Sequence, residues 1–120
     1  MNDLRLGEIE SRFAEIIWKN EPLSSAGLAL FAEKELGWKK TTSYTVLKRL
    51  CAKGIFQNSN GEVTSLIKKD KYYSLKSERF VDESFGGSLP AFLTAFTNGK
   101  SLSQEEIKEI KKIISEYEEV

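Results

Sequence analysis

The chain has 120 residues, and its 18 basic and 18 acidic side chains give a formal net charge of zero. This length suits one small domain, or one domain with an appended element, and excludes a large multidomain architecture. Histidine is absent and Cys51 is the only cysteine, which removes the usual general base and excludes an intrachain disulfide or a cysteine-cluster metal site. There is no leader pattern and no apolar run near the ~18 residues of a membrane span. We therefore expect a cytoplasmic protein with no enzymatic activity, catalytic residue, cofactor, metal or membrane insertion.

Two amphipathic helices are predicted in the first 36 residues. The first carries apolar side chains at steps of three and four from Leu6 to Ile17, which places them on one face. An Asn-Glu-Pro sequence ends this helix. The second begins at Ser24 or Ser25, either of which suits an N-cap, and Gly37 supplies its C-terminal stop.

A third helix is predicted from a cap at Thr41 or Thr42 to about Lys53, where Gly54 ends it. Spacing at 100° per residue gives this helix one apolar side and one side that is small, hydroxylated and cationic. The residues that we assign to the second side and its flanks are Lys39, Lys40, Thr41, Thr42, Tyr44, Thr45, Lys48, Arg49 and Lys53.

A β-hairpin is predicted next, because β-branched and aromatic residues follow Gly54 and residues 58–61 have turn chemistry. In this prediction Val63–Ile67 is a strand and Tyr72–Leu75 is the returning strand. Residues 68–71 form the charged tip between them. The tip carries Lys68, Lys69 and Lys71, which would then lie beside a bound partner.

The chain from Ser77 onward is predicted to form helices that hold two copies together. A short helical segment breaks at Gly86-Gly87, Ser88 opens the next helix, and a Ser-Gln-Glu-Glu capping box at Ser103 opens the last. Too few residues remain in this region to cover its apolar stripes within one chain, so we expect a homodimer. The stripes comprise Leu89, Phe92, Leu93, Phe96, Ile107, Ile110, Ile114 and Tyr117.

The neutral total conceals a strongly basic middle. Residues 36–76 hold nine basic and two acidic side chains, a net charge of +7, between segments of −3 and −4, and no acidic residue occurs from Leu36 through Gly61. Hydroxyls and cations suit a helix in the major groove, whereas a carboxylate facing the phosphates would be repelled. Three helices, a cationic recognition helix at about 42–53 and a basic hairpin are the parts of a winged helix-turn-helix that binds operator DNA. The predicted fold is mainly α with a small β-hairpin wing, with a DNA-binding domain over 1–76 and a helical dimerisation region over 77–120.

Several stretches of the chain also carry a family pattern, in the family's order. They are Ala14–Trp18, Trp38–Leu50 with Lys53-Gly54, Tyr72–Leu75, and Gly87–Leu89 followed by Leu102–Ile107. In these stretches the sequence resembles the penicillinase-repressor family of bacterial transcriptional regulators (BlaI/MecI/CopY type). The resemblance implies a homodimeric repressor on a palindromic operator. By position it assigns recognition-helix contacts to Thr42, Tyr44, Thr45 and Arg49.

The chain departs from the family pattern in three places. Repressors of the β-lactam-resistance branch are inactivated when a membrane metalloprotease pathway cuts an Asn-Phe bond, which implies a sensor or protease as partner. The matching candidate cleavage site here is Ala95-Phe96, without the asparagine. The paired Cys-x-Cys motifs of the copper-sensing branch are absent, so metal sensing is not expected. Few residues separate Leu75 from Gly86, so we expect a linker helix about three turns shorter and an altered separation of the DNA-binding heads.

Other interpretations of the same residues stay open from the sequence alone. The basic face would also suit a winged-helix protein–protein interaction module, and Tyr44 would also suit the edge of the core. Cys51 is expected to pack as a small apolar residue, with redox or metal sensing as the alternative. A hydrolase using Glu8 and Glu10 has no histidine, cysteine or glycine-rich loop near these carboxylates to support it.

Overall fold

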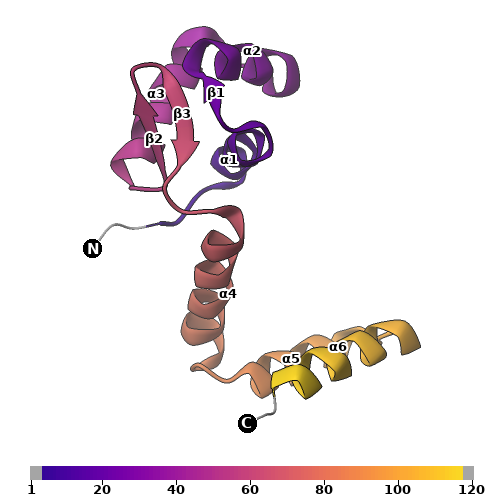
Figure 1. The fold of residues 1–120 in the computed structure, drawn as a ribbon. Helices are drawn as coiled ribbons and strands as arrows, with labels where there is room; N and C mark the ends of the chain where they lie inside the picture. The colour runs from indigo at the N-terminus through magenta and orange to yellow at the C-terminus, as the bar shows by residue number, and fades with distance from the viewer. Residues whose placement is uncertain (1–3, 118–120) are drawn as a thin grey trace. The chain divides into compact units, whose positions relative to one another are not determined.

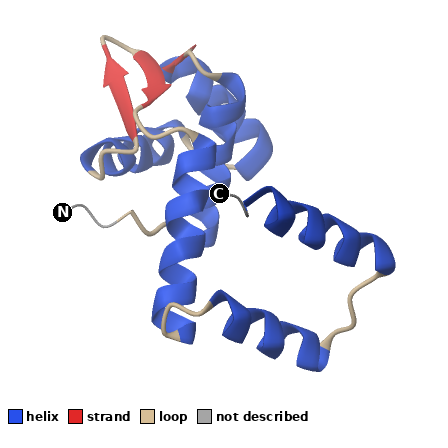
Figure 2. Ribbon diagram, turned by 60° about the horizontal axis from the view of Figure 1, so that its bottom comes forward, coloured by secondary structure: helices blue, strands red, loops and turns tan. Residues whose placement is uncertain are grey.

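A computed structural model describes residues 4–117, which form six helices and a three-stranded sheet (Figures 1 and 2). The elements are α1 (Glu8–Asn20), β1 (Leu23–Ser24), α2 (Ser25–Leu36), α3 (Lys40–Ala52), β2 (Phe56–Ser59), β3 (Glu62–Ser65), α4 (Lys69–Phe85), α5 (Leu89–Gly99) and α6 (Gln104–Tyr117). By its internal contacts the chain divides into two compact units, residues 1–76 and 77–120. The predicted fold class, mainly α with a small wing, is confirmed.

The core of the first unit lies where α1, α2 and α3 meet the sheet. Phe13 and Ile17 from α1, Leu28 from α2, Leu50 from α3 and Phe56 from β2 are almost completely buried. These side chains lie at the helical and strand spacings that direct them to one side of each element. Their burial supplies the main stabilising term for the unit that carries the basic surface.

The ends of α2 are capped as predicted, but the start of α3 is not. Ser24 accepts a hydrogen bond from the Gly27 amide at 2.9 Å, and Gly37 takes the left-handed conformation with φ 71°. The N-cap of α3 is Lys39, whose side chain makes no cap. The predicted cap at Thr41 or Thr42 is therefore wrong, since both residues lie within the first turn of the helix.

The wing is a hairpin of β2 and β3, with β1 added to its other edge in the order β1-β3-β2. Both pairings are antiparallel, and Leu23 faces Val63 while Phe56 faces Ser65. The turn between β2 and β3 has positive φ at Asn60 (53°) and at Gly61 (88°), as two-residue hairpin turns require. The hairpin thus turns at residues 60–61, within the segment 58–61 that the sequence predicts to be a turn. The two-residue strand β1 was not predicted.

The predicted returning strand at Tyr72–Leu75 is wrong, because these residues lie in α4. Lys69, assigned to the wing tip, is the first residue of this 17-residue helix. The expected shortening of the linker assumed that the helix begins after Leu75; it begins at Lys69 and is ~25 Å long at ~1.5 Å per residue. Tyr72 is its buried residue and belongs to the core of the first unit.

In the second unit the end of α4 packs on α5 through aromatic rings. The rings of Phe80, Phe85 and Phe92 lie with centroids 5.5–5.9 Å apart, and Phe96 lies 6.0 Å from Phe92. Edge-to-face pairs at such distances are favourable. The caps predicted at Ser88 and Ser103 are confirmed, since each hydroxyl accepts an amide hydrogen bond at 3.1 Å. Helices α5 and α6 run in roughly opposite directions (Figure 2).

Candidate nucleic-acid interface

Helix α3 has the two different faces that its sequence predicts. Ser43, Val46, Leu47 and Leu50 are buried against the rest of the first unit. The opposite face and its flanks are exposed to solvent and, apart from Ala52, contain hydroxyl, aromatic and cationic side chains. These exposed residues are Lys39, Lys40, Thr41, Thr42, Tyr44, Thr45, Lys48 and Arg49.

Local contacts restrain several side chains of this face. The Thr45 hydroxyl donates to the Thr41 carbonyl oxygen at 2.9 Å, which turns the Thr45 methyl group away from that bond. The Lys40 ammonium lies 6.0 Å from the centre of the Tyr44 ring, within cation–π range. Tyr44 is exposed rather than part of the core. The face is therefore polar and partly ordered before any ligand arrives.

Arg49 is held by a residue of another helix. Its Nη1 donates to Glu10 Oε2 of α1 at 2.9 Å, and Glu10 Oε1 accepts from the Gly7 amide at 3.2 Å. The hydrogen bond from Arg49, aided by Gly7, holds the pKa of the Glu10 carboxyl below its ordinary value despite partial burial. No sequence pattern indicates this pair, because 39 positions separate the two residues. Lys53 donates to the Arg5 carbonyl oxygen, so its ammonium is directed to the segment before α1.

The three lysines assigned to the wing tip do not lie there. Lys68 precedes α4 and pairs with Glu21 at 3.4 Å, and Lys69 pairs with Glu15 at 2.8 Å. Lys71 is exposed in the first turn of α4, two residues after Lys69. The actual tip of the wing is the neutral, polar segment 58–61, which the sequence had marked as a turn.

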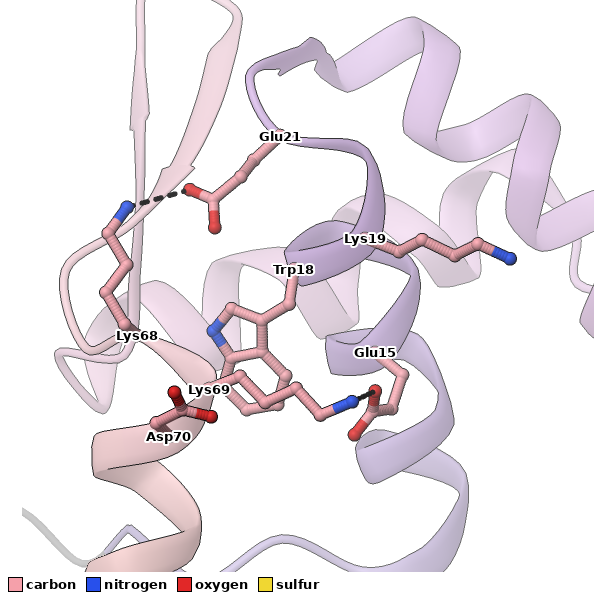
Figure 3. A pocket seen from close by; sticks show the side chains of 7 residues that line it. All are labelled: Glu15, Trp18, Lys19, Glu21, Lys68, Lys69 and Asp70. Carbon is pink, nitrogen blue, oxygen red and sulfur yellow. Dashed lines mark hydrogen bonds and ion pairs between the residues drawn. The ribbon is translucent and has the colours of Figure 1, made fainter.

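Lys68 and Lys69 line an open hollow of about 410 Å³ beside α1 (Figure 3). Burial would raise the pKa of the Glu15 carboxyl, but hydrogen bonds from Lys69 and Tyr73 lower it overall. The pKa of Glu21 is likewise lowered, against burial, by hydrogen bonds from Ser65 and Lys68. Two carboxylates of this hollow therefore pair with exposed lysines that the sequence assigns to DNA. The lining residues are Glu15, Trp18, Lys19, Glu21, Lys68, Lys69 and Asp70.

Residues proposed for other chemistry have ordinary structural surroundings. Glu8 forms an ion pair with Arg12 at 3.6 Å, and Glu10 forms one with Arg49. Cys51 is half-buried, and burial raises the pKa of its thiol. In residues 4–117 no group of three or more His, Cys, Asp and Glu side chains is placed to hold a metal ion. No helix in that part of the chain is long and apolar enough to cross a membrane.

The second unit leaves large apolar side chains in contact with solvent. Within the described residues, α5 and α6 contain no buried side chain. Ile114 is 53% exposed and Tyr117 is 85% exposed, whereas Phe92 and Phe96 also pack within the chain. Ala95 and Phe96 lie inside α5, so a protease would reach their peptide bond only after that helix opens locally.

The arrangement identifies the class of protein. Three helices with an exposed, cationic third helix, followed by an antiparallel hairpin, make the first unit a winged helix-turn-helix domain. Helices follow it in the chain.

Comparison with known proteins identifies the family. The sequence model of the penicillinase repressor family matches residues 6–116. The penicillinase repressor of Bacillus licheniformis is 27% identical over 117 residues, which cover 94% of this chain and 91% of the relative. The methicillin resistance regulatory proteins MecI of Staphylococcus aureus strain Mu50 and Mammaliicoccus sciuri are 24% and 23% identical over 114 residues, with 92% of this chain and 93% of each relative covered. The chain belongs to the penicillinase repressor family, a family of transcriptional repressors.

Proposed function

We propose that this protein is a homodimeric repressor that places α3 in the major groove of a palindromic operator. The observation that carries the proposal is the exposed face of α3, a helix whose 13 residues include no acidic side chain. Its hydroxyl groups suit base edges and its cations suit phosphates, which together supply specificity and affinity. Occupation of the operator would block transcription of the genes behind it.

Different parts of the surface have different proposed roles. Thr42, Tyr44 and Thr45, in the N-terminal half of α3, contact base edges. Arg49 and the lysines 39, 40 and 48 contact phosphates on either side of the groove. The polar wing tip at 58–61 lies against the flanking backbone, where amide groups donate to phosphate oxygens. Lys68, Lys69 and Lys71 stay in the proposed contact set beside the flanking backbone, with Lys68 and Lys69 held by Glu21 and Glu15.

The apolar stripes of α5 and α6 form the proposed dimer contact. Leu89 is 53% exposed and Ile114 is equally so, and a second copy would remove both from water. Burial of such side chains is favourable by ~25 cal/mol per Å² of apolar surface. A two-fold dimer would present two copies of α3 to half-sites about one DNA turn apart, or a multiple of it.

The test begins with random-sequence DNA, from which the full chain selects the fragments that it retains. We expect one palindromic sequence to emerge and to bind the protein with a steep salt dependence. Arg49→Ala and Lys48→Ala should each weaken binding and reduce the log–log salt slope by roughly 0.9 per lost phosphate contact. Lys112→Ala, which removes one exposed cation from α6, is the control and should leave both quantities unchanged.

The same experiment separates the repressor from a winged-helix module that binds another protein. Such a module would retain DNA without sequence selection, or not at all. Equal binding of the selected fragment by wild type, Arg49→Ala and Lys48→Ala would also contradict the proposed contacts.

A further inference from the structure

A partly buried carboxylate of α1, that of Glu10, pairs with the guanidinium of Arg49 in α3. The side chain of Glu10 is only 19% exposed, while that of Arg49 is 53% exposed, and 2.9 Å separates Oε2 from Nη1. A carboxylate removed from water in this way needs an ionic or hydrogen-bonding partner. The contact therefore restrains Arg49 in the free protein.

The other oxygen of Glu10 fixes the direction of that contact. Glu10 Oε1 accepts the hydrogen bond from the Gly7 amide at 3.2 Å, at the first turn of α1. The Gly7 carbonyl oxygen in turn accepts from the Ser11 amide at 2.8 Å. Because the carboxylate is tied to the helix backbone, its second oxygen presents a fixed acceptor to Arg49.

Arg49 also lines the surface that we assign to DNA. Together with Thr41, Thr42, Thr45 and Val46 it borders a shallow hollow of about 210 Å³ on the exposed side of α3. A guanidinium has five N–H donors in a planar fork. The Glu10 contact occupies one nitrogen, Nη1, which leaves other donors for a phosphate or a base edge.

We propose that Glu10 is a positioning residue for DNA recognition, which holds the Arg49 guanidinium in its binding orientation before DNA arrives. This inference rests on the proposed DNA-binding function of α3. Ordering a long side chain in advance removes part of the entropy cost of binding. Glu10 also brings a negative charge toward the phosphates, but its ion pair with Arg49 and its burial limit the repulsion, so positioning dominates.

A double-mutant cycle on the selected DNA fragment tests this role with Glu10→Gln, Arg49→Ala and the double variant. Glutamine keeps an oxygen for the Gly7 amide and removes the charge that holds Arg49. We expect the Glu10→Gln variant to bind the DNA about five- to tenfold more weakly, because the Arg49 side chain would then have to be ordered during binding. In the Arg49→Ala background the same change should have no further effect. Glu8→Gln removes an equal charge two residues earlier in α1, where the partner is Arg12, and should change affinity less than about twofold.

A second measurement separates positioning from general stability. Side-chain ¹⁵N NMR of the free protein should show restricted rotation of the Arg49 guanidinium in wild type and in Glu8→Gln, and free rotation in Glu10→Gln. If Glu10→Gln fails to fold, Glu10→Asp replaces it, because it keeps the charge but withdraws it by one methylene group. Undiminished affinity of a folded Glu10 variant, or additive losses in the cycle, would overturn the inference. Absence of sequence-selective binding by wild type would instead overturn the proposed function.

Discussion

The indole Nε1 of Trp18 donates a hydrogen bond to the carbonyl oxygen of Ile67 at 3.0 Å. This bond joins the last turns of α1 to the segment between β3 and α4. The Trp18 ring also lies 5.2 Å from the ring of Phe56 and 5.3 Å from that of Tyr72. Trp18 thus connects the helical core, the wing and the start of α4.

Trp18→Phe should destabilise the first unit. The substitution retains an aromatic ring but leaves the Ile67 carbonyl oxygen without its donor, which predicts a loss of about 1–3 kcal/mol in the free energy of unfolding. Urea denaturation followed by circular dichroism measures the change. Trp38→Phe is the matched control, because Trp38 stacks on Phe13 at 5.0 Å and tests the loss of indole packing in the same core. A loss no larger than that of the control would argue against the hydrogen bond as the cause.

The positions of the helices could be predicted from the sequence more accurately than that of the wing. Apolar periodicity and caps placed α2 and α6 because those signals lie within each element. The residues around Tyr72 are aromatic and follow a charged run, which fits either a strand after a tip or the first turns of a helix. In the structure Tyr72 joins the core beside Trp18, and Tyr73 donates a hydrogen bond to Glu15. These residues of α1 lie more than 50 positions earlier, so no local pattern contains the answer.

The candidate site shows the same division between local and distant information. The exposed face of α3 could be predicted because a 3.6-residue period separates it from Val46 and Leu50. Glu10 could not be connected to Arg49, since side chains on two helices meet only after the helices pack. The sequence marks Glu10 merely as one acid on an amphipathic helix.

Tyr73 should make the protein sensitive to alkaline pH. Its hydroxyl donates to Glu15 Oε2 at 2.7 Å, and this hydrogen bond, with burial and the charge of Glu15, raises the pKa of Tyr73 to about 12. A raised pKa means that the folded state favours the neutral phenol. The stabilisation is therefore complete below the ordinary pKa of 10.0 and is lost as pH rises from 10 toward 12.

Ultraviolet absorbance during alkaline titration measures this directly. The Tyr73 phenol should ionise only as pH approaches about 12, and Tyr73→Phe should remove that step from the titration. The difference in unfolding free energy between wild type and Tyr73→Phe should shrink across the same pH range, since the comparison cancels the titration of lysines. If the step that Tyr73→Phe removes lies near pH 10, the predicted role of Glu15 is contradicted.

Ser43→Ala should stabilise the protein. Ser43 is 2% exposed, and its hydroxyl oxygen has no hydrogen-bond partner among residues 4–117. A buried, unpaired hydroxyl costs free energy, and alanine also has the higher helix propensity, which together predict a gain of about 0.5–1 kcal/mol. Ser65→Ala is the contrasting variant, because the buried Ser65 hydroxyl donates to Glu21 at 2.8–2.9 Å. The midpoint temperature of thermal unfolding should rise for Ser43→Ala and fall for Ser65→Ala. Equal shifts of the two variants would contradict the explanation.

Ile110→Asp and Ile114→Asp should convert the proposed dimer into monomers. Both residues lie on the apolar stripe of α6, and a carboxylate buried there without a partner would oppose association strongly. Sedimentation velocity at micromolar concentrations should find a dimer for wild type and a monomer for each variant. Lys112→Asp introduces a carboxylate on the opposite, charged side of the same helix and should leave the dimer intact. Because two copies of α3 bind two half-sites, the monomers should also lose most of their affinity for the palindrome while retaining weak binding to a half-site. A monomeric wild type, or full affinity in the monomeric variants, would show that the α6 stripe does not hold the DNA-bound assembly together.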